Sequence, residues 1–427
     1  MNVEKTLFWY ISALTILSLI AWQITFIYGQ YLGAGYPYDI FLYRQPGVVS
    51  FDDFTRFGTH LHLWKENGLI KAIPLNHLGY PFFAVDEYSF KTRPPIIYSP
   101  LGTYSHLLFY FLYPSKPVYA LLLSIFLTAC ATSILLAYKL RHSPMAGMFG
   151  VAIIITMLTS YPLMFELDRA NIEGFAWIFS CLGIISFINN KYMISGILLA
   201  ISAIKFYTGI FLLLFLAKKR YTEFVISVIF LIWLHLFSAY ELSGNIFRPF
   251  CTLSEGVSSL FRDHVILGRM LLEFDVSLFA VIKQIFFVVH LPVNMFVYYL
   301  YTLVSIGGFV ALYILKARHL PLLNQLFIFT VAIILLPYVS MMYKLLYLTT
   351  AWGGFMVFLA YDAKPTGFST KQALHILISV AILFTPQTYL ISNEIGGFGG
   401  QIKAIVLLYL LVFVVRNPMH SPTLFRE

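Results

Sequence analysis

Long uncharged apolar runs recur along the whole chain and restrict what it can fold into. Of its 427 residues, 59% are hydrophobic and only 11% are charged. Soluble domains carry about 25% charged residues, so this composition is typical of a polytopic membrane protein. The first run extends from Leu7 to Tyr28 and lacks a cleavage signature. We therefore predict a retained helix there, not a removed signal peptide.

Further runs approach the length of about 20 residues that a membrane-spanning helix needs. They are Val118–Tyr138, Ala146–Met164, Ile172–Ile188, Phe224–Tyr240, Val293–Leu315, Leu320–Ser340, Leu345–Tyr361, Ala373–Ile391 and Ile402–Val415. The run Met193–Ala217 is interrupted by "AIKFYTG" and is predicted to form two half-helices that meet at Lys205. Leu101–Tyr113 is too short to span.

Basic residues in the short loops predict how the chain is oriented, because cytoplasmic loops are enriched in Lys and Arg. The basic segments are "KLRH" (Lys139–His142), "KKR" (Lys218–Arg220), "KARH" (Lys316–His319), Lys364 and Lys371, with Lys5 and Arg416 near the termini. One path of the chain across the membrane places all of these residues on the cytoplasmic side. This path also puts both termini on the cytoplasmic side, and it puts the segments Gly29–Lys116, Phe165–Asn171 and Glu241–Pro292 outside.

The predicted fold is therefore a single integral membrane domain over residues 1–427, in the all-α polytopic class. We expect about 11–13 transmembrane helices. Amphipathic extracytoplasmic helices are predicted at Asp52–Asn67 and within Ser254–Phe287. The net charge of +9 fits the basic loops and contact with anionic lipid, and it gives no support for nucleic-acid binding.

The stretch "SFDDFTRFGTHLHLWKENG" (Ser50–Gly68) is the most polar part of the first outer segment. A helix that begins near Ser50 places successive residues about 100° apart. Phe54, Phe57, Leu61 and Trp64 then share an apolar face, bordered by Asp53, Arg56 and His60. Asp52 faces water in this arrangement. If the helix begins after Asp53, the two aspartates become equal candidates.

Three later polar breaks are predicted on the same outer face. "KTRPPIIYSPLGTYSHLL" (Lys91–Leu108) carries a Pro-Pro pair, which ends any helix at Arg93. "FELDRANIEGF" (Phe165–Phe175) is predicted to be a polar loop between two spans. "SAIKFYTGIF" (Ser202–Phe211) puts Lys205 inside an apolar run, and an ionisable residue at such depth is a functional candidate.

These segments, in this order, resemble glycosyltransferases of the GT-C superfold. The chain looks most like the bacterial polyprenyl-phosphate-dependent alpha-mannosyltransferase family. The matching elements are "DFTRF" (Asp53–Phe57), "RPPIIYSP", "DRAN" (Asp168–Asn171), "ISAIKFYTGIFLLLFLAKKR" and "LPYVSMMYKLLYL" (Leu336–Leu348). The resemblance covers about residues 8–362. Arg93, Asp168-Arg169, Thr208 and Tyr343-Lys344 depart from the family pattern, which leaves the sugar and the donor open.

The resemblance implies an inverting transfer of a mannose-like hexose or a pentose from a polyprenyl-phosphate donor. Asp53 would be the general base and His60 would orient it or bind a sugar hydroxyl. The substrate-binding residues that it implies are Arg56, Arg93, Tyr98, Asp168, Arg169, Asn171, Lys205, Tyr343 and Lys344. The implied acceptor is a lipid-linked sugar or a polysaccharide, on the extracytoplasmic face of a bacterial inner membrane. We expect a monomer in the lipid bilayer, with no nucleic-acid partner.

We expect no cofactor and no metal. His60 and His62 stand at i and i+2, which is the wrong spacing for one helical face. Three other functions stay open. A lipid or glycan flippase or another transporter would use broken helices in the same way. A polysaccharide polymerase or ligase is also multi-spanning, and an assembly subunit would need no working acid.

Overall fold

The computed structural model describes residues 3–32, 99–110, 155–157, 159–169, 171–251, 267–268, 272–361, 366–385, 390–392 and 396–421. The helix predicted at Asp52–Asn67 lies outside these residues, together with Asp53, Arg56, His60, Arg93 and Tyr98. The span predicted at Val118–Tyr138 and the segment Lys139–His142 also lie outside them.

Helices make up most of the described part of the chain. The amino-terminal half holds α1 (Val3–Leu32), α3 (Pro100–Tyr110), α6 (Tyr161–Arg169), α7 (Glu173–Ile188), α8 (Tyr192–Ser202), η1 (Phe206–Leu212), α9 (Leu213–Ala217) and α10 (Tyr221–Ser243). The carboxy-terminal half holds η3 (Leu272–Phe274), α12 (Leu278–Val288), α13 (Met295–Leu315), η4 (Ala317–His319), α14 (Leu322–Leu335), η5 (Met342–Tyr347), α15 (Leu348–Tyr361), α16 (Thr370–Phe384) and α17 (Gly399–Arg416). A small antiparallel ladder joins β1 (Leu390–Ser392) to β2 (Gly396–Gly397).

The helical membrane class that the sequence predicts agrees with this architecture. Among the described residues, three helical stretches are long and apolar enough to cross a membrane: Tyr221–Ser243, Met295–His319 and Gly399–Arg416. Seven shorter apolar helices accompany them in the described ranges. The predicted number of spans therefore stays a prediction.

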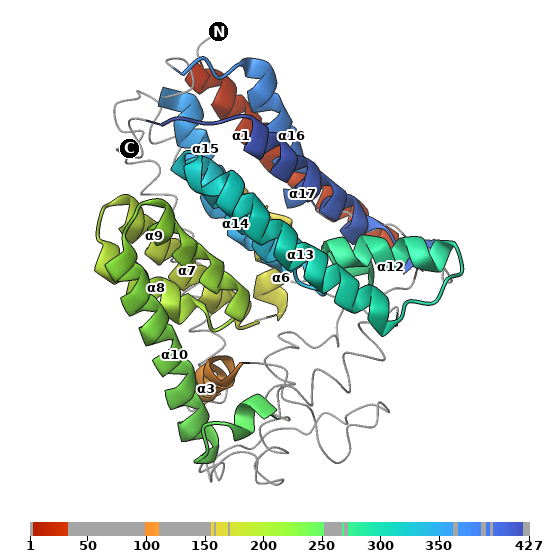
Figure 1. The fold of residues 1–427 in the computed structure, drawn as a ribbon. Coiled ribbons are helices and arrows are strands. Elements are labelled where there is room, and N and C mark those ends of the chain that lie inside the picture. The colour runs from red at the N-terminus through yellow and green to blue at the C-terminus, as the bar shows by residue number, and fades with distance from the viewer. Residues whose placement is uncertain are drawn as a thin grey trace.

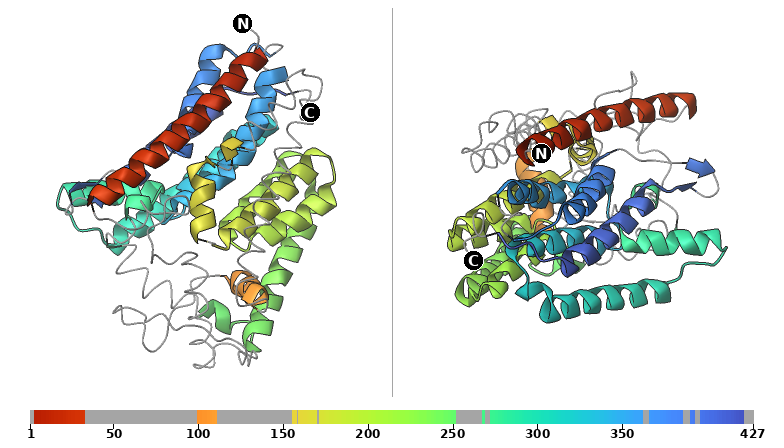
Figure 2. Two further views of the ribbon diagram at one scale, coloured as in Figure 1. Left: turned by 180° about the vertical axis from the view of Figure 1, so that it is seen from behind. Right: turned by 90° about the horizontal axis from the view of Figure 1, so that it is seen from above.

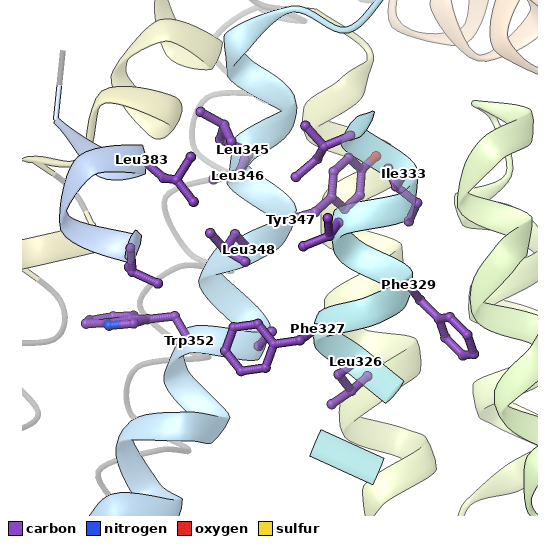
Figure 3. Packing of buried hydrophobic residues seen from close by; sticks show 14 of the residues in the cluster. Leu326, Phe327, Phe329, Ile333, Leu345, Leu346, Tyr347, Leu348, Trp352 and Leu383 are labelled. Carbon is purple, nitrogen blue, oxygen red and sulfur yellow. The ribbon is translucent and has the colours of Figure 1, made fainter. Parts of the chain in front are cut away.

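Helix α14 lies at the centre of the packing. Every one of its 14 residues is buried, which is typical of a helix that is apolar on all sides. Figure 3 shows its Phe327 and Ile333 packed among side chains from η5, α15 and α16, including Tyr347 and Trp352. Helix α13 is the opposite case, because only 6% of its apolar window is buried.

The described helices form two neighbouring groups (Figures 1 and 2). One group contains α1 and α13 to α17, and the other contains α7 to α10. Both groups have basic residues at one common end. Lys218, Arg318 and His420 line a single hollow there, and the Gln372 side chain donates to Asn417 Oδ1 at 2.7 Å. The basic segments at 218–220 and 316–319, Lys371 and the end of α17 therefore lie together, as expected if all face one side.

The two half-helices predicted around Lys205 are present. Helix α8 ends at Ser202, and η1 begins at Phe206 and continues into α9. Because Arg220 lies over the Tyr192 ring at 4.4 Å, the start of α8 and the end of α9 are neighbours. The segment therefore enters and returns to the same end, and Lys205 lies at its tip. The Ser202 carbonyl, freed at the end of α8, accepts a 2.7 Å hydrogen bond from the Thr208 hydroxyl.

The polar loop predicted at Phe165–Asn171 is wrong for most of its length, since α6 continues through Arg169. The polar composition does not require a loop here, because two of the polar side chains bond to the start of the next helix. Glu166 Oε1 accepts from the Gly174 N–H at 2.7 Å, and Asn171 Oδ1 accepts from the Glu173 N–H at 3.0 Å. These bonds satisfy the first N–H groups of α7 and let α6 and α7 adjoin with a very short connection.

Two predicted spans also end earlier than expected. Helix α16 ends at Phe384, and Leu390–Ser392, near the end of the run predicted at Ala373–Ile391, forms β1 instead. Helix α14 ends at Leu335, so the last residues of the run Leu320–Ser340 are not helical. Tyr301 stabilises this break, because its hydroxyl donates to the carbonyls of Leu335 and Leu336 at 2.9 and 3.0 Å.

We expect Gly400→Ala to destabilise the protein. A Cβ at Gly400 would collide with the carbonyl group of Asp275. Asp275 cannot move easily, because its carboxylate accepts from the Ser277 and Ser340 N–H groups at 2.9 Å each. Overpacking of this kind costs about 1–3 kcal/mol. The loss should appear as a lower midpoint of thermal unfolding in detergent.

Gly308→Ala is the matched control for this prediction. Nothing lies within 4 Å of a Cβ built at Gly308 in α13. The same substitution there should leave stability unchanged or raise it by about 0.5–1 kcal/mol, from helix propensity. Equal midpoints for the two variants would contradict the predicted collision at Gly400.

Candidate functional site

Four of the polar segments singled out in the sequence meet in the structure. The Ser99 hydroxyl, one residue after the predicted Arg93–Tyr98 segment, donates to the Ile204 carbonyl at 2.6 Å. Leu101, Ile172 and Ile204 form a small buried cluster beside this bond. The start of α3, the α6–α7 connection and the tip of the α8–η1 hairpin are therefore in direct contact.

Glu173 is the centre of the polar cluster. Its side chain is fully buried at the first residue of α7. Lys205 Nζ lies 3.8 Å from Glu173 Oε2, and the Tyr207 hydroxyl donates a hydrogen bond to the same oxygen. The Tyr347 hydroxyl lies beside this carboxylate without meeting the geometry of a hydrogen bond. A buried carboxylate with a cation partner is costly to build, so its presence marks a candidate site.

Lys344 reaches the cluster from η5, the fourth segment. Its Nζ lies 4.0 Å from the centre of the Tyr207 ring and donates to the Val339 carbonyl at 3.3 Å. A cation in contact with an aromatic face is attracted by the ring quadrupole. Tyr207 is thus held between Lys344 on its ring and Glu173 at its hydroxyl. Two lysines share the neighbourhood of one carboxylate.

Burial lowers the pKa of Lys344 to about 8. The residue lies between two predicted spans, in the break that follows α14. The Glu173 carboxylate raises this pKa and the Lys205 ammonium lowers it, but desolvation is the largest cause. The ammonium of Lys344 therefore loses its proton close to physiological pH, in a way that an exposed lysine does not.

Asn171 and Tyr343 complete the described site. Asn171 Nδ2 donates to the Tyr343 hydroxyl at 3.4 Å while its Oδ1 caps α7. The Tyr343 ring stacks on Phe165, with ring centroids 5.8 Å apart. This contact joins η5 to α6, and it fixes the distance between the Lys344 and Glu173 ends of the cluster.

The structure thus brings together Asn171, Lys205, Tyr343 and Lys344 among the residues predicted for the site. Asp168 and Arg169 belong to the last turn of α6. Asp53, Arg56, His60, Arg93 and Tyr98 lie outside the described residues.

Glu173 and Tyr207 were not among the site residues predicted from the sequence. Glu173 was the first charged residue of an apolar run, and the reasoning that selected Lys205 applies equally to it. Tyr207 carried no such signal, because one more tyrosine in a chain with 29 of them does not stand out. Only its position between two charged groups identifies it.

The fold and the composition are those of a helical membrane protein, and the buried charged cluster lies at the tip of the hairpin that α8 and η1–α9 form. Comparisons of the chain with protein-family models, curated proteins and solved structures found no match.

Proposed function

We propose that the protein is a membrane glycosyltransferase of the GT-C type. It moves a mannose-like hexose or a pentose from a polyprenyl-phosphate donor to a lipid-linked or polysaccharide acceptor on the extracytoplasmic face. One observation supports the proposal most strongly. Lys205 contacts Glu173, Tyr207 bonds to the same carboxylate, and Lys344 lies on the Tyr207 ring. These lysines come from two distant polar breaks, both of which the family resemblance had selected.

The chemistry of a lipid-phosphate donor explains what such a cluster does. As the sugar leaves, negative charge develops on the lipid phosphate, and fixed cations stabilise it. Lys205 is the more accessible cation, with 17% of its side chain exposed, whereas Lys344 is 6% exposed. In this proposal Lys205 contacts the phosphate directly. Glu173 and Tyr207 hold the two ammonium groups in place before the donor arrives.

Substituting Lys205 tests the proposal. We expect Lys205→Met to lower sugar transfer by about 10²-fold or more. In other enzymes, removing one hydrogen-bond donor that stabilises negative charge in the transition state has an effect of this size. The assay supplies membranes with polyprenyl-phosphate mannose or a polyprenyl-phosphate pentose and measures glycan product per amount of protein. The matched control is Lys191→Met, because Lys191 is exposed at the start of α8, away from the cluster. Equal activity of both variants would remove the phosphate role of Lys205.

The lowered pKa of Lys344 predicts a pH dependence. A phosphate binds the ammonium and not the neutral amine, so the affinity for the donor should fall as pH rises through about 8. Lys344→Arg keeps the charge over this range, because arginine stays protonated. We expect the donor KM of the wild type to rise between about pH 7 and about pH 9 and that of Lys344→Arg to change less. Identical pH profiles would contradict the role given to Lys344.

The break between α8 and η1 at Lys205 also favours the transporter alternative. Broken helices with charged tips bind substrates in transporters as well. The two functions differ in their product. A transporter moves a lipid-linked sugar without forming a glycosidic bond, so purified protein with donor and acceptor on one face yields no new glycan. A covalent product under those conditions excludes the transporter.

A further inference from the structure

A basic hollow lies at the end of α9 that faces away from Lys205. Its volume is about 190 Å³. The residues that matter for its chemistry are Lys218, Arg318, His319, Leu322, Gln325 and His420. They come from the end of α9, from η4, from the first turns of α14 and from the tail after α17. Four separate parts of the described chain therefore contribute to it.

The tail is held in place by α14. The Asn324 side chain donates to the carbonyls of Val414 and Asn417 at 2.8 and 2.9 Å and accepts from the Met419 N–H at 2.7 Å. These three bonds are buried or half-buried. They position His420, the next residue, at the rim of the hollow. Residues 417–421, which follow α17, therefore form an ordered side of this site.

Among the described residues, the cations of the hollow are not matched by acids in its lining. The described lining includes Lys218 and Arg318 and contains no aspartate or glutamate. The Arg318 Nε–H donates to His319 Nε2 at 2.9 Å. This bond orients the guanidinium through Nε and does not use its two terminal NH₂ groups. Like charges gathered in one hollow repel each other, so a bound anion is expected to stabilise them.

The first turn of α14 adds positive potential. Pro321 is its N-cap residue and makes no side-chain cap, and Leu322 and Gln325 line the hollow. The first N–H groups of a helix lack acceptors within it, and the helix dipole places partial positive charge there. Phosphate groups are bound at helix N-termini of this kind. This helix is 14 residues long, so its dipole is well developed.

Gln325 supplies a second and independent indication of a ligand. Its side chain is 4% exposed, and Nε2 donates to the Leu320 carbonyl at 2.7 Å. This bond leaves Oε1 as a buried acceptor without a partner in the described part of the chain. A buried acceptor of this kind is costly to leave unsatisfied. The ligand should therefore bring a hydrogen-bond donor as well as an anion.

The surface next to the hollow is suited to acyl chains. Helix α13 ends directly before it, and Leu315 and Ile314 are 76% and 46% exposed. Further apolar side chains continue along the same helix, including Leu303 at 72% and Val304 at 62%. A ligand with a phosphate in the hollow and hydrocarbon chains along α13 would cover both surfaces.

We propose that this hollow binds the headgroup of an anionic glycerophospholipid that carries a hydroxyl group beyond its phosphate. The phosphate contacts Lys218, Arg318 and the N-terminus of α14, and the headgroup hydroxyl donates to Gln325 Oε1. The hollow lies at the opposite end of η1–α9 from Lys205, so the lipid would occupy the leaflet opposite to the candidate active site. It is therefore a lipid site separate from the proposed donor site, and its test does not depend on transfer activity.

The test measures which lipids the full chain retains. The protein is placed in nanodiscs of equal parts phosphatidylglycerol and phosphatidylcholine with the same acyl chains, and native mass spectrometry counts the lipids that stay bound. We expect wild type to retain phosphatidylglycerol preferentially. The double variant Lys218→Gln, Arg318→Gln should bind it about fivefold more weakly for each cation removed.

The matched control is Lys219→Gln, Lys316→Gln. It removes the same two charges from exposed neighbours that do not line the hollow. Retention of phosphatidylglycerol by the control and its loss in the hollow variant support the site. Equal retention in all three proteins overturns it. If the hollow variant does not insert, Arg318→Lys replaces it, because a lysine keeps the charge but not the forked geometry.

A final arm separates the two possible sources of phosphate. Inorganic phosphate is added to the wild-type nanodiscs at increasing concentration. If the lipid is retained at millimolar phosphate, the proposal stands. Full displacement of phosphatidylglycerol at micromolar phosphate would assign the hollow to free phosphate and overturn the lipid site.

Discussion

Asp53→Asn is expected to lower sugar transfer by about 10²–10⁴-fold, the usual contribution of a general base. The proposed reaction needs a carboxylate that accepts a proton from the acceptor hydroxyl. Asn preserves the size and much of the helix-capping ability of Asp, so helix stability should change little. What Asn cannot do is accept that proton at neutral pH. Glycan product in membranes, normalised to protein level, measures the loss.

Asp52→Asn is the matched control for this prediction. The two aspartates are adjacent, and a helix that begins near Ser50 directs Asp53 toward the membrane boundary and Asp52 toward water. We expect Asp52→Asn to keep most of the activity. Wild-type activity in Asp53→Asn would remove the general base from the proposal and favour the transporter or the assembly subunit.

Glu173→Gln is expected to destabilise the protein by about 3–5 kcal/mol, the cost of removing one partner from a buried ion pair. The variant keeps the volume of the side chain but removes the carboxylate whose negative charge offsets the two nearby lysines, Lys205 and Lys344. The loss should appear in thermal unfolding of the detergent-solubilised protein. It should be smaller where lipid-phosphate donor is present, because the phosphate supplies the missing negative charge.

A second substitution distinguishes charge from packing as the cause. In the variant Glu173→Gln, Lys205→Met, one of the two ammonium groups is gone together with the carboxylate. If uncompensated charge is the cause, the double variant should regain stability relative to Glu173→Gln. Additive losses from the two changes would contradict the charge argument and leave local packing around Tyr207 as the reason.

Breaks in hydrophobic runs were readable from the sequence because they depend on local chemistry. Lys205 within an apolar run predicted two half-helices, and α8 and η1 separate there. The order of the polar segments was also readable, and four of them meet around Glu173. Helix boundaries that depend on which groups the polar side chains bind were not readable. Helix α6 extends through Arg169 while Glu166 and Asn171 bond to the first N–H groups of α7, and a polar composition does not distinguish such bonds from those of a loop.

The partners of the site residues were decided only by the tertiary structure. Glu173 and Lys205 are separated by two antiparallel helices, and Lys344 reaches Tyr207 from the other half of the chain. No pattern in the sequence gives the distance between such residues. The sequence identified ionisable groups in apolar surroundings. Which of them lie near the same carboxylate depends on how the α8–η1 hairpin and η5 pack.

The amino-acid sequence by itself determined that the chain forms apolar helices, that one apolar run is interrupted at Lys205, and which loops are basic. It could not determine which helices face lipid. Helices α13 and α14 are both rich in Leu, Ile, Val and Phe, yet α14 is buried along its whole length and only 6% of the apolar window of α13 is buried. The physical reason is that lipid tails are as apolar as a protein interior, so hydropathy does not distinguish the two environments. Only packing against neighbouring helices decides between them.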